Sequence, residues 1–436
     1  MMFDDLKSAA RRIGGERSLR TLLVDCQRLL SERGAANSVA IAKRIVDRFD
    51  ELPPAAQTAF FERLAADFNP DPQAVLDSAI AYAEVPDADN LLQLTQLAEP
   101  PRQELLRRIN RAPGGTAALV RMRRALLKQL GRHPSLRPLE SDLLHLLSSW
   151  FNPGFLQMRE VDWQSPAQLL EQIIRHEAVH QIDGWDDLRR RLLPDRRCFA
   201  FFHPQLPDEP LIFVEVALLP QMPAAIAPLI DKTDTPLPAS KFKVAAFYSI
   251  SNCQPGLRSV SLGNFLIKRV AEKLQRELPQ LKTFCTLSPI PGFAAWLALE
   301  HDFENLPDLK PAAARRAEAA LALLHAVCGG DWTQLSSTAG LTALDDAGQQ
   351  ALLRLCAVYL VHQTTTTQGD PVARFHLDNG ARLERINREG NPGPAGLEQS
   401  CGLMVNYLYD LDKIESSHEA FTQGQVVHSR AVGSLV

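Results

Sequence analysis

The sequence predicts an α+β protein in two parts, an all-helical domain at residues 1–151 and a domain of mixed strands and helices at residues 152–436. The chain has 436 residues, of which 45% are hydrophobic and 22% charged, which is typical of a globular protein with about two domains. Apolar residues recur at helical spacing through the first part. Apolar runs rich in β-forming residues begin only after Trp150.

Helices fill the N-terminal part. The apolar residues from Ala42 to Phe49 have helical spacing, and Pro53-Pro54 ends that segment. The same spacing recurs from Phe61 to Phe68 and stops at the Asn-Pro-Asp-Pro run of 69–72. Further helices are predicted near 100–111 and 115–130. We expect a bundle or a layered helical domain without catalytic residues of its own.

The C-terminal part alternates strands with helices, which predicts a sheet covered by helices. Strands are predicted at 198–202, 211–219, 244–250, 281–287 and 372–377. Helices are predicted near 166–176, 264–277, 291–300, 310–326 and 347–360. The Pro- and Ala-rich segment 221–240 is interpreted as a surface connection.

Charge and composition exclude several classes of protein. Lys plus Arg is 47 and Asp plus Glu is 51, giving a net charge of −4, which disfavours a nucleic-acid partner. No run of about 18 apolar residues predicts a membrane span, and the N-terminus lacks the apolar core of a signal peptide. Seven scattered cysteines without a Cys-x-x-Cys pair indicate reduced thiols. We therefore expect a cytoplasmic protein that is not bound to membranes.

One candidate site is the run from His176 to His180, which matches the His-Glu-x-x-His signature of zinc hydrolases. Two histidines four residues apart on a helix could hold zinc while Glu177 activates water. The alternative is a helix end that carries two polar histidines. A zinc site would need a third ligand on a nearby element, such as Asp183 or Glu215, and we expect no metal.

A second candidate is the predicted strand, loop and helix from Lys243 to Leu278. A Gly-containing loop that enters a helix presents free backbone N–H groups and the positive end of the helix dipole, which together bind phosphate. Arg258 and Ser259 could add charge-assisted hydrogen bonds. The alternative is a plain turn with a glycine at a tight bend.

Ser288 and His376 are two further candidates. Ser288 follows a predicted strand and precedes the rigid run Pro289-Ile290-Pro291-Gly292. Its hydroxyl could donate to a developing oxyanion, or it could cap the helix that follows. His376 lies in a predicted strand before an Asn-Gly turn, where it could move a proton or serve only a structural role.

Taken together, several motifs resemble the malonyl-CoA decarboxylase family. They run in order from about residue 150 to 410: the FNPGF run at 151–155, EAVH at 177–180, RRC at 196–198, FYSIS at 247–251, GNFLIKRV at 263–270, LSPIPGF at 287–293, FHL at 375–377, NG at 379–380, SCGLM at 400–404 and NY at 406–407. The order and number of these motifs make the resemblance specific.

This resemblance implies a helical oligomerisation domain and a catalytic domain with the GNAT acyltransferase fold. It implies the conversion of malonyl-CoA to acetyl-CoA and CO2 without a metal or organic cofactor, by a homotetramer or dimer. Ser288 and His376 match the family's catalytic serine and histidine. The CoA-binding loop corresponds to Arg258, Ser259, Val260, Ser261, Leu262, Gly263 and Asn264. Ser261 stands where the family often has a glutamate, so a role for that carboxylate does not carry over.

The chemistry of decarboxylation agrees with these residue types. Loss of CO2 leaves an enolate next to the thioester, so the site has to stabilise charge on the thioester oxygen and then protonate the α-carbon. We assign the proton-donor role to His376, as an imidazolium, and expect Ser288 to bind the carboxylate or the enolate. Asn406, Tyr407 and Tyr409 are expected to line the site. The alternatives are a CoA-dependent acyltransferase, a zinc hydrolase and a non-enzymatic helical scaffold.

Overall fold

The structure is a computed structural model that describes residues 2–31, 37–260, 262 and 266–436. The chain divides into two compact units. The first comprises residues 1–157 together with 202–211 and 253–262, and the second comprises the remaining segments up to Val436. The first unit therefore contains, besides the helical N-terminal part, two short segments from the strand-containing part of the sequence.

The first unit is built from helices α1 (Met2–Leu30), α2 (Ser38–Glu51), α3 (Pro54–Asp67), α4 (Pro72–Glu84), α5 (Ala88–Ala98), α6 (Pro101–Asn110), α7 (Gly115–Leu127) and α8 (Arg137–Trp150), with short turns at Pro134–Leu136 and Pro153–Phe155. The apolar faces predicted from the sequence are buried in its core. Phe49 lies 5.6 Å from Phe60 and from Phe61 between ring centroids, and all three rings are at most 2% exposed. The predicted helical character of the N-terminal part is confirmed.

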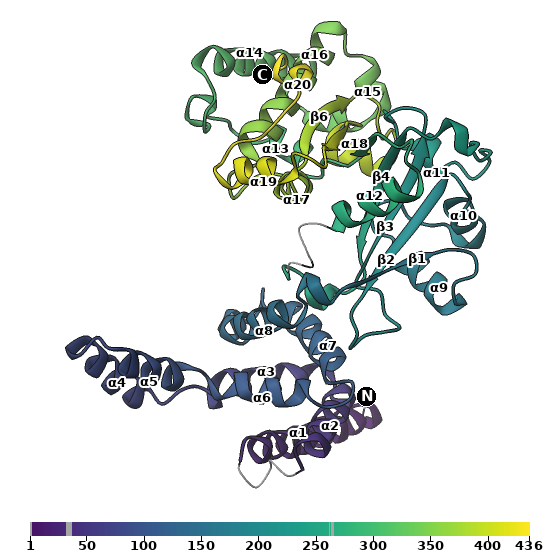
Figure 1. The fold of residues 1–436 in the computed structure, drawn as a ribbon. Coiled ribbons are helices and arrows are strands. Elements are labelled where there is room, and N and C mark those ends of the chain that lie inside the picture. The colour runs from purple at the N-terminus through teal and green to yellow at the C-terminus, as the bar shows by residue number, and fades with distance from the viewer. Residues whose placement is uncertain (1, 32–36, 261, 263–265) are drawn as a thin grey trace. The chain divides into compact units, whose positions relative to one another are not determined.

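The second unit is built on a seven-stranded mixed sheet of order β1-β2-β3-β4-β5-β7-β6 (Figure 1). Its strands are β1 (Gln157–Val161), β2 (Arg196–Phe202), β3 (Ile212–Leu219), β4 (Val244–Asn252), β5 (Thr283–Thr286), β6 (Arg382–Asn387) and β7 (Met404–Tyr409). Strands β4 and β5 run parallel, with Val244 opposite Thr283 and Phe247 opposite Thr286. The pairs β2–β3, β3–β4, β5–β7 and β6–β7 are antiparallel. The predicted α+β class with a mixed sheet is confirmed.

The helices of the second unit are α9 (Ala167–His176), α10 (Gly184–Arg191), α11 (Ala227–Ile230), α12 (Leu266–Glu277), α13 (Phe293–Leu297), α14 (Pro311–Val327), α15 (Thr338–Thr342), α16 (Asp346–Val358), α17 (Pro371–Asp378), α18 (Pro394–Ser400), α19 (Ile414–Thr422) and α20 (Arg430–Gly433). A π-helical turn at Tyr359–Gln363 extends α16. Helix α12 packs on the sheet, because Arg269 lies over the ring of Phe201 and Lys273 over that of Phe199. Its predicted apolar stripe is buried, at Leu266, Ile267, Val270 and Leu274.

One predicted strand is wrong, since residues 372–377 form most of helix α17. Pro371 occupies the first turn, and the Asp370 side chain accepts hydrogen bonds from the backbone N–H groups of Val372 and Ala373. This N-terminal cap starts a helix where the short apolar run alone suggested a strand. Strands β1, β6 and β7 were not predicted. No helix in the described parts of the chain has an apolar stretch long enough to cross a membrane.

Candidate functional site

Ser288 lies just after the end of β5, where its backbone pairs with Val405 of β7. Its backbone N–H donates to the carbonyl of Val405 at 2.8 Å, and its carbonyl accepts from the N–H of Val405 at 3.0 Å. Its hydroxyl donates to Thr286 Oγ1 at 2.9 Å and does not cap helix α13, whose N-cap residue is Gly292. The capping alternative is therefore wrong, because the hydroxyl bonds the side chain of Thr286 and not the start of α13.

His376 on α17 faces Ser288 inside the second unit. The two side chains are 88 residues apart in the sequence, yet Ser288 Oγ lies 2.9 Å from His376 Nε2. Ser288 is 4% exposed and His376 3% exposed, so the contact is almost wholly enclosed. A hydroxyl and an imidazole at this distance can exchange a proton directly.

Two tyrosines of β7 complete the surroundings of the imidazole. The hydroxyl of Tyr409 lies 2.9 Å from His376 Nδ1, so both ring nitrogens have partners. The ring of Tyr407 stacks on the imidazole with 4.7 Å between centroids. The Tyr407 hydroxyl is buried and has no hydrogen-bond partner among the described residues. Alternate residues of one strand point to the same face, which explains why both rings reach His376.

Asp370 joins the turn after Ser288 to the helix that carries His376. Its Oδ1 accepts the two N–H groups that start α17, while Oδ2 accepts the N–H of Gly292 at 3.0 Å. The hydroxyl of Tyr359 hydrogen-bonds to the same carboxylate. A Cβ on Gly292 would lie 2.3 Å from the Tyr359 hydroxyl, so only glycine fits there. The Asp-Pro pair at 370–371 is a helix-start signal that could have located this residue in the sequence.

Burial controls the protonation state of the site. Desolvation lowers the pKa of His376 to about 3, so the imidazole is neutral at neutral pH in the unliganded protein. Burial also raises the pKa of Tyr409 well above its usual value, so its phenol stays protonated. A neutral imidazole has one donor and one acceptor nitrogen, which the hydroxyls of Tyr409 and Ser288 can satisfy together.

Asn406, the third predicted lining residue, uses its whole side chain on protein contacts. Its Nδ2 donates to the carbonyls of Thr286 at 2.8 Å and Pro223 at 3.1 Å. Its Oδ1 accepts from Arg385 at 3.1 Å and from Asn387 at 2.9 Å. These bonds tie β7 to the end of β5 beside Ser288.

The predicted CoA-binding loop is described only in part. Arg258 and Ser259 are exposed, while Val260 and Leu262 are each 7% exposed. Ser259 has a φ of 65°, in the left-handed region that a serine rarely adopts. The predictions for Ser261, Gly263 and Asn264 lie outside the described residues. The described loop residues belong to the first unit, whereas Ser288 and His376 belong to the second.

The zinc alternative is wrong in its geometry. Helix α9 ends at His176, and Glu177 has extended backbone, so His176 and His180 do not share a helix face. The Glu177 carboxylate instead accepts hydrogen bonds from the hydroxyls of Ser249 and Ser251 and from two backbone N–H groups. Among the described residues, no group of three or more His, Cys, Asp or Glu side chains could hold a metal ion.

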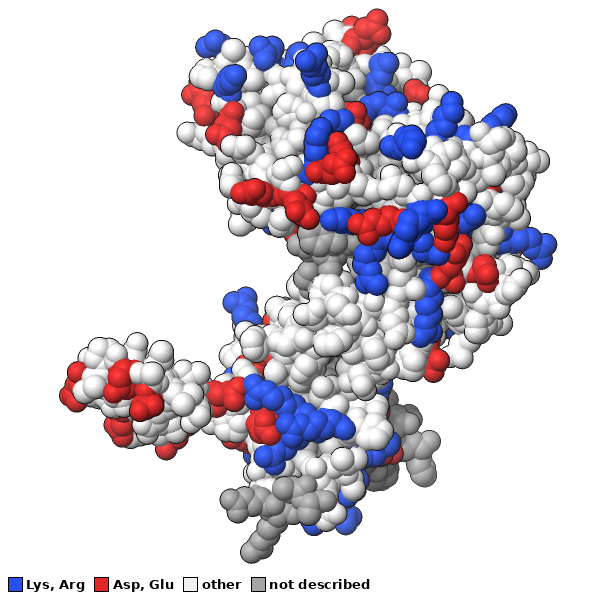
Figure 2. Space-filling model, viewed as in Figure 1, with Lys and Arg blue, Asp and Glu red and all other residues white. Residues whose placement is uncertain are grey.

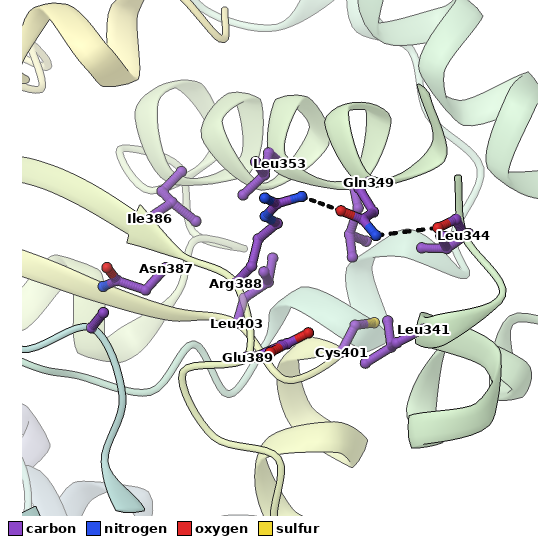
Figure 3. Close-up of a pocket in the computed structure, with 12 residues that line it drawn as sticks. Leu341, Leu344, Gln349, Leu353, Ile386, Asn387, Arg388, Glu389, Cys401 and Leu403 are labelled. Carbon is purple, nitrogen blue, oxygen red and sulfur yellow. Dashed lines mark hydrogen bonds between the residues drawn. The ribbon is translucent and has the colours of Figure 1, made fainter. Parts of the chain in front are cut away.

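A separate hollow of about 440 Å³ lies between α16 and the end of β6 (Figure 3). Leucines from both sides line it, and the guanidinium of Arg388 reaches across to the side chain of Gln349. Its twelve lining residues include neither serine nor histidine. This hollow therefore offers no pair for proton transfer like the one at Ser288.

Two family models match most of the chain. The malonyl-CoA decarboxylase C-terminal domain matches residues 154–436, and the malonyl-CoA decarboxylase N-terminal domain matches residues 68–151. The two matches together cover the sheet-containing part of the chain and more than half of its helical part.

Individual relatives agree with these matches. The mitochondrial malonyl-CoA decarboxylase of Anser anser anser is 36% identical over an alignment of 345 residues, and the match covers 74% of this chain and 66% of the goose protein. The mitochondrial enzyme of Mus musculus is 35% identical over 88% of this chain and 82% of its own length. A crystal structure of malonyl-CoA decarboxylase from Rhodopseudomonas palustris is 46% identical, with a TM-score of 0.82 over 95% of this chain and 98% of that one.

Proposed function

The chain belongs to the malonyl-CoA decarboxylase family and is a carboxy-lyase acting on malonyl-CoA, and we propose that Ser288 and His376 carry out its reaction. The observation that supports this assignment is the 2.9 Å contact between Ser288 Oγ and His376 Nε2. It brings a hydroxyl and an imidazole from distant parts of the sequence into one enclosed site. Decarboxylation needs a donor for the growing enolate and a proton for the α-carbon, and this pair can provide both.

In this proposal Ser288 stabilises the charge that develops on the thioester oxygen. As the bond to the carboxylate breaks, its electron pair moves onto the α-carbon and the thioester carbonyl, and CO2 leaves. A donor held in place before the reaction stabilises this charge without reorganising solvent, which is worth about 3–4 kcal/mol in comparable sites. The backbone bonds between Ser288 and Val405 hold the donor in place.

His376 then supplies the proton, but it is not charged beforehand. Burial lowers the pKa of His376 to about 3, so in this proposal the imidazolium expected from the sequence arises during the cycle. A substrate carboxylate bound next to the imidazole raises the pKa of His376, because an opposite charge nearby favours the charged form. The histidine therefore takes up a proton as the substrate binds and transfers it to the α-carbon once CO2 has left.

The test is incubation with malonyl-CoA and mass analysis of the products for the wild type, Ser288→Ala and His376→Ala. We expect acetyl-CoA from the wild type and a kcat at least about 100-fold lower in each variant, since each loses a group that acts only in the transition state. His325→Ala, at an exposed histidine of α14, is the matched control and should retain wild-type turnover.

Two results would contradict the assignment. Wild-type turnover in either Ser288→Ala or His376→Ala would remove that residue from the mechanism. Release of free CoA to an added amine, without CO2, would indicate the acyltransferase alternative instead.

The loop at Arg258 and Ser259 is proposed as the binding site for the phosphates of CoA. The Arg258 guanidinium is exposed and has no ion pair or hydrogen bond with the described residues. An exposed arginine can bind a phosphate with two parallel hydrogen bonds. The left-handed backbone at Ser259 turns the chain at this point, next to the charged side chain.

We also propose a homotetramer or dimer, with helices α4 and α5 as contact surface. No residue of α5 is buried, and only Ser78 is buried on α4. Large apolar side chains are 37–58% exposed on this hairpin, at Leu76, Ile80, Val85, Leu91, Leu92 and Leu97. Residues 71–99 contain carboxylates but no Lys or Arg, and acidic side chains stand out on the hairpin in Figure 2. An exposed apolar surface with polar groups around it is typical of protein–protein contacts.

The cytoplasmic location stays a prediction.

A further inference from the structure

Arg123 of α7 is buried in the first unit, where its guanidinium binds the backbone of the proposed CoA-binding loop. The residue is 1% exposed. One guanidinium nitrogen, Nη1, donates to the carbonyl oxygens of Gly256 and Arg258, both at 2.8 Å. The other, Nη2, donates to the carboxylate of Glu140 on α8 at 2.7 Å.

Burying a guanidinium costs free energy, so the groups that it bonds indicate why it is buried. Taking a charge out of water destabilises the fold unless the charge is paired and hydrogen-bonded. Arg123 has one carboxylate partner, and its other hydrogen bonds go to two neutral carbonyls of a single short segment. Its Nε has no partner among the described residues. The bonds to the loop are therefore a main part of what this side chain does.

The loop backbone also touches α7 directly. A Cβ built on Gly256 would lie 2.1 Å from the carbonyl oxygen of Val120, so the chain passes so close to the helix that only glycine fits. Leu257, the next residue, is fully buried. The contact at Gly256 and the bonds from Arg123 together fix the loop on both sides of Leu257.

One of the two carbonyls that Arg123 bonds belongs to Arg258, whose side chain is proposed to bind the phosphates of CoA. Ser259 follows directly in the left-handed conformation. Arginine presents donors in a rigid planar fork, so one side chain can fix two carbonyls in a set relative position, which a lysine ammonium cannot do equally well. The helical unit thus determines the backbone conformation from which Arg258 and Ser259 project.

We propose that Arg123 is a positioning residue for substrate binding, which acts by holding the loop from Gly256 to Ser259 in its phosphate-binding conformation. This inference rests on the proposed role of that loop. It gives the helical unit a part in recognising the nucleotide end of the substrate, where the sequence suggested only a structural or oligomerisation role.

The test compares two substrates, malonyl-CoA and malonyl-pantetheine, which carries the same thioester but lacks the nucleotide and its phosphates. For Arg123→Lys and Arg123→Gln we expect KM for malonyl-CoA to rise about tenfold, the effect of weakening hydrogen bonds from a charged group. We expect kcat to stay near the wild-type value. Both constants for malonyl-pantetheine should equal those of the wild type, because that substrate does not reach the phosphate site.

The matched control is Arg121→Gln, two residues away on the same helix. Arg121 is exposed and pairs with Asp50 at 2.6 Å, so its loss should leave both substrates unaffected. Arg258→Ala should raise KM for malonyl-CoA alone. An unchanged KM in Arg258→Ala would reject the proposed role of the loop. No turnover of malonyl-CoA by the wild type would reject the proposed function. Neither result would contradict the contact between Arg123 and the loop backbone.

Hydrogen exchange of the peptide covering 253–260 supplies a second measurement. In Arg123→Lys we expect faster exchange in this peptide, with unchanged exchange in α2 and α3. If KM rises equally for both substrates, or if kcat falls for both, Arg123 serves only the stability of the fold and the proposal is overturned. If Arg123→Gln does not fold, Arg123→Lys, which retains the charge, decides the question by the same criteria.

Discussion

At the scale of single residues, burial decides how His376 behaves. The imidazole is enclosed by the rings and hydroxyls around it, and desolvation alone lowers its pKa to about 3. Between pH 6.5 and about pH 3 the unfolded chain therefore binds a proton at this position while the folded chain does not. The folded state consequently loses stability as the pH falls from 6.5 towards 3.

This linkage predicts how the pH dependence of stability changes in His376→Gln. The variant lacks the titrating group, so between pH 7 and 5 its thermal midpoint should fall less steeply than that of the wild type. The reason is that the wild type takes up as much as about one more proton on unfolding than the variant does. Other buried groups, such as His180 with a pKa lowered to about 4 and Glu215 with a pKa raised to about 7, act equally in both proteins. Parallel midpoint curves would show that His376 is not held neutral by the fold.

At the scale of elements, one carboxylate links two segments that carry the reacting groups. Asp370 starts α17 through its Oδ1 and holds the N–H of Gly292 through its Oδ2. Burial raises the pKa of Asp370, and the hydrogen bonds from Ala373, Gly292 and Val372 oppose that rise. The relative position of Ser288 and His376 thus depends on this bridge as well as on the sheet.

Asp370→Asn tests the bridge while sparing the helix. The amide oxygen can still cap α17, but the NH2 group that replaces Oδ2 cannot accept from Gly292. We expect kcat to fall about tenfold or more, because a buried N–H left without an acceptor costs about 1–3 kcal/mol and the turn after Ser288 shifts to relieve it. The helical circular dichroism should match the wild type. A wild-type kcat in a folded Asp370→Asn protein would show that the bridge has no part in catalysis.

At the scale of the whole molecule, the two compact units do not coincide with the two halves of the sequence. The segments 202–211 and 253–262 pack with the helical part, although they come from the strand-containing part of the chain. The same helical part also exposes the apolar surface of α4 and α5. Neither feature follows from the order of elements along the chain.

The oligomer proposal predicts that charges placed on the α4–α5 surface dissociate the assembly. In the double variant Ile80→Glu and Leu92→Glu, light scattering should give a lower mass than for the wild type. Ile80 is 49% and Leu92 58% exposed, so each change should alter subunit stability by no more than about 0.5 kcal/mol. Leu299→Glu, at a residue 59% exposed in the second unit, is the control and should keep the wild-type mass. A monomeric wild type, or a double variant of unchanged mass, would refute the proposed contact.

Local patterns were sufficient for much of the fold. The helices around Ile45, Phe61 and Val270 and the strands β2 to β5 follow from apolar spacing, because a periodic stripe has to be buried whatever else surrounds it. Local patterns failed for residues 372–377, where the cap at Asp370 outweighed a short apolar run. They also missed β1, whose side chains are mostly exposed or partly exposed.

The sequence by itself determined the fold class, the family resemblance and the identity of Ser288 and His376 as residues to examine, since residue types and their order are local information. Only the tertiary structure decided that their side chains meet at 2.9 Å, that the imidazole is neutral, and that Arg123 holds the loop at Gly256 and Arg258. Distances, desolvation and the partners of a buried charge depend on segments that are 88 to 135 residues apart in the chain. No local pattern encodes them, because they exist only after both segments are packed.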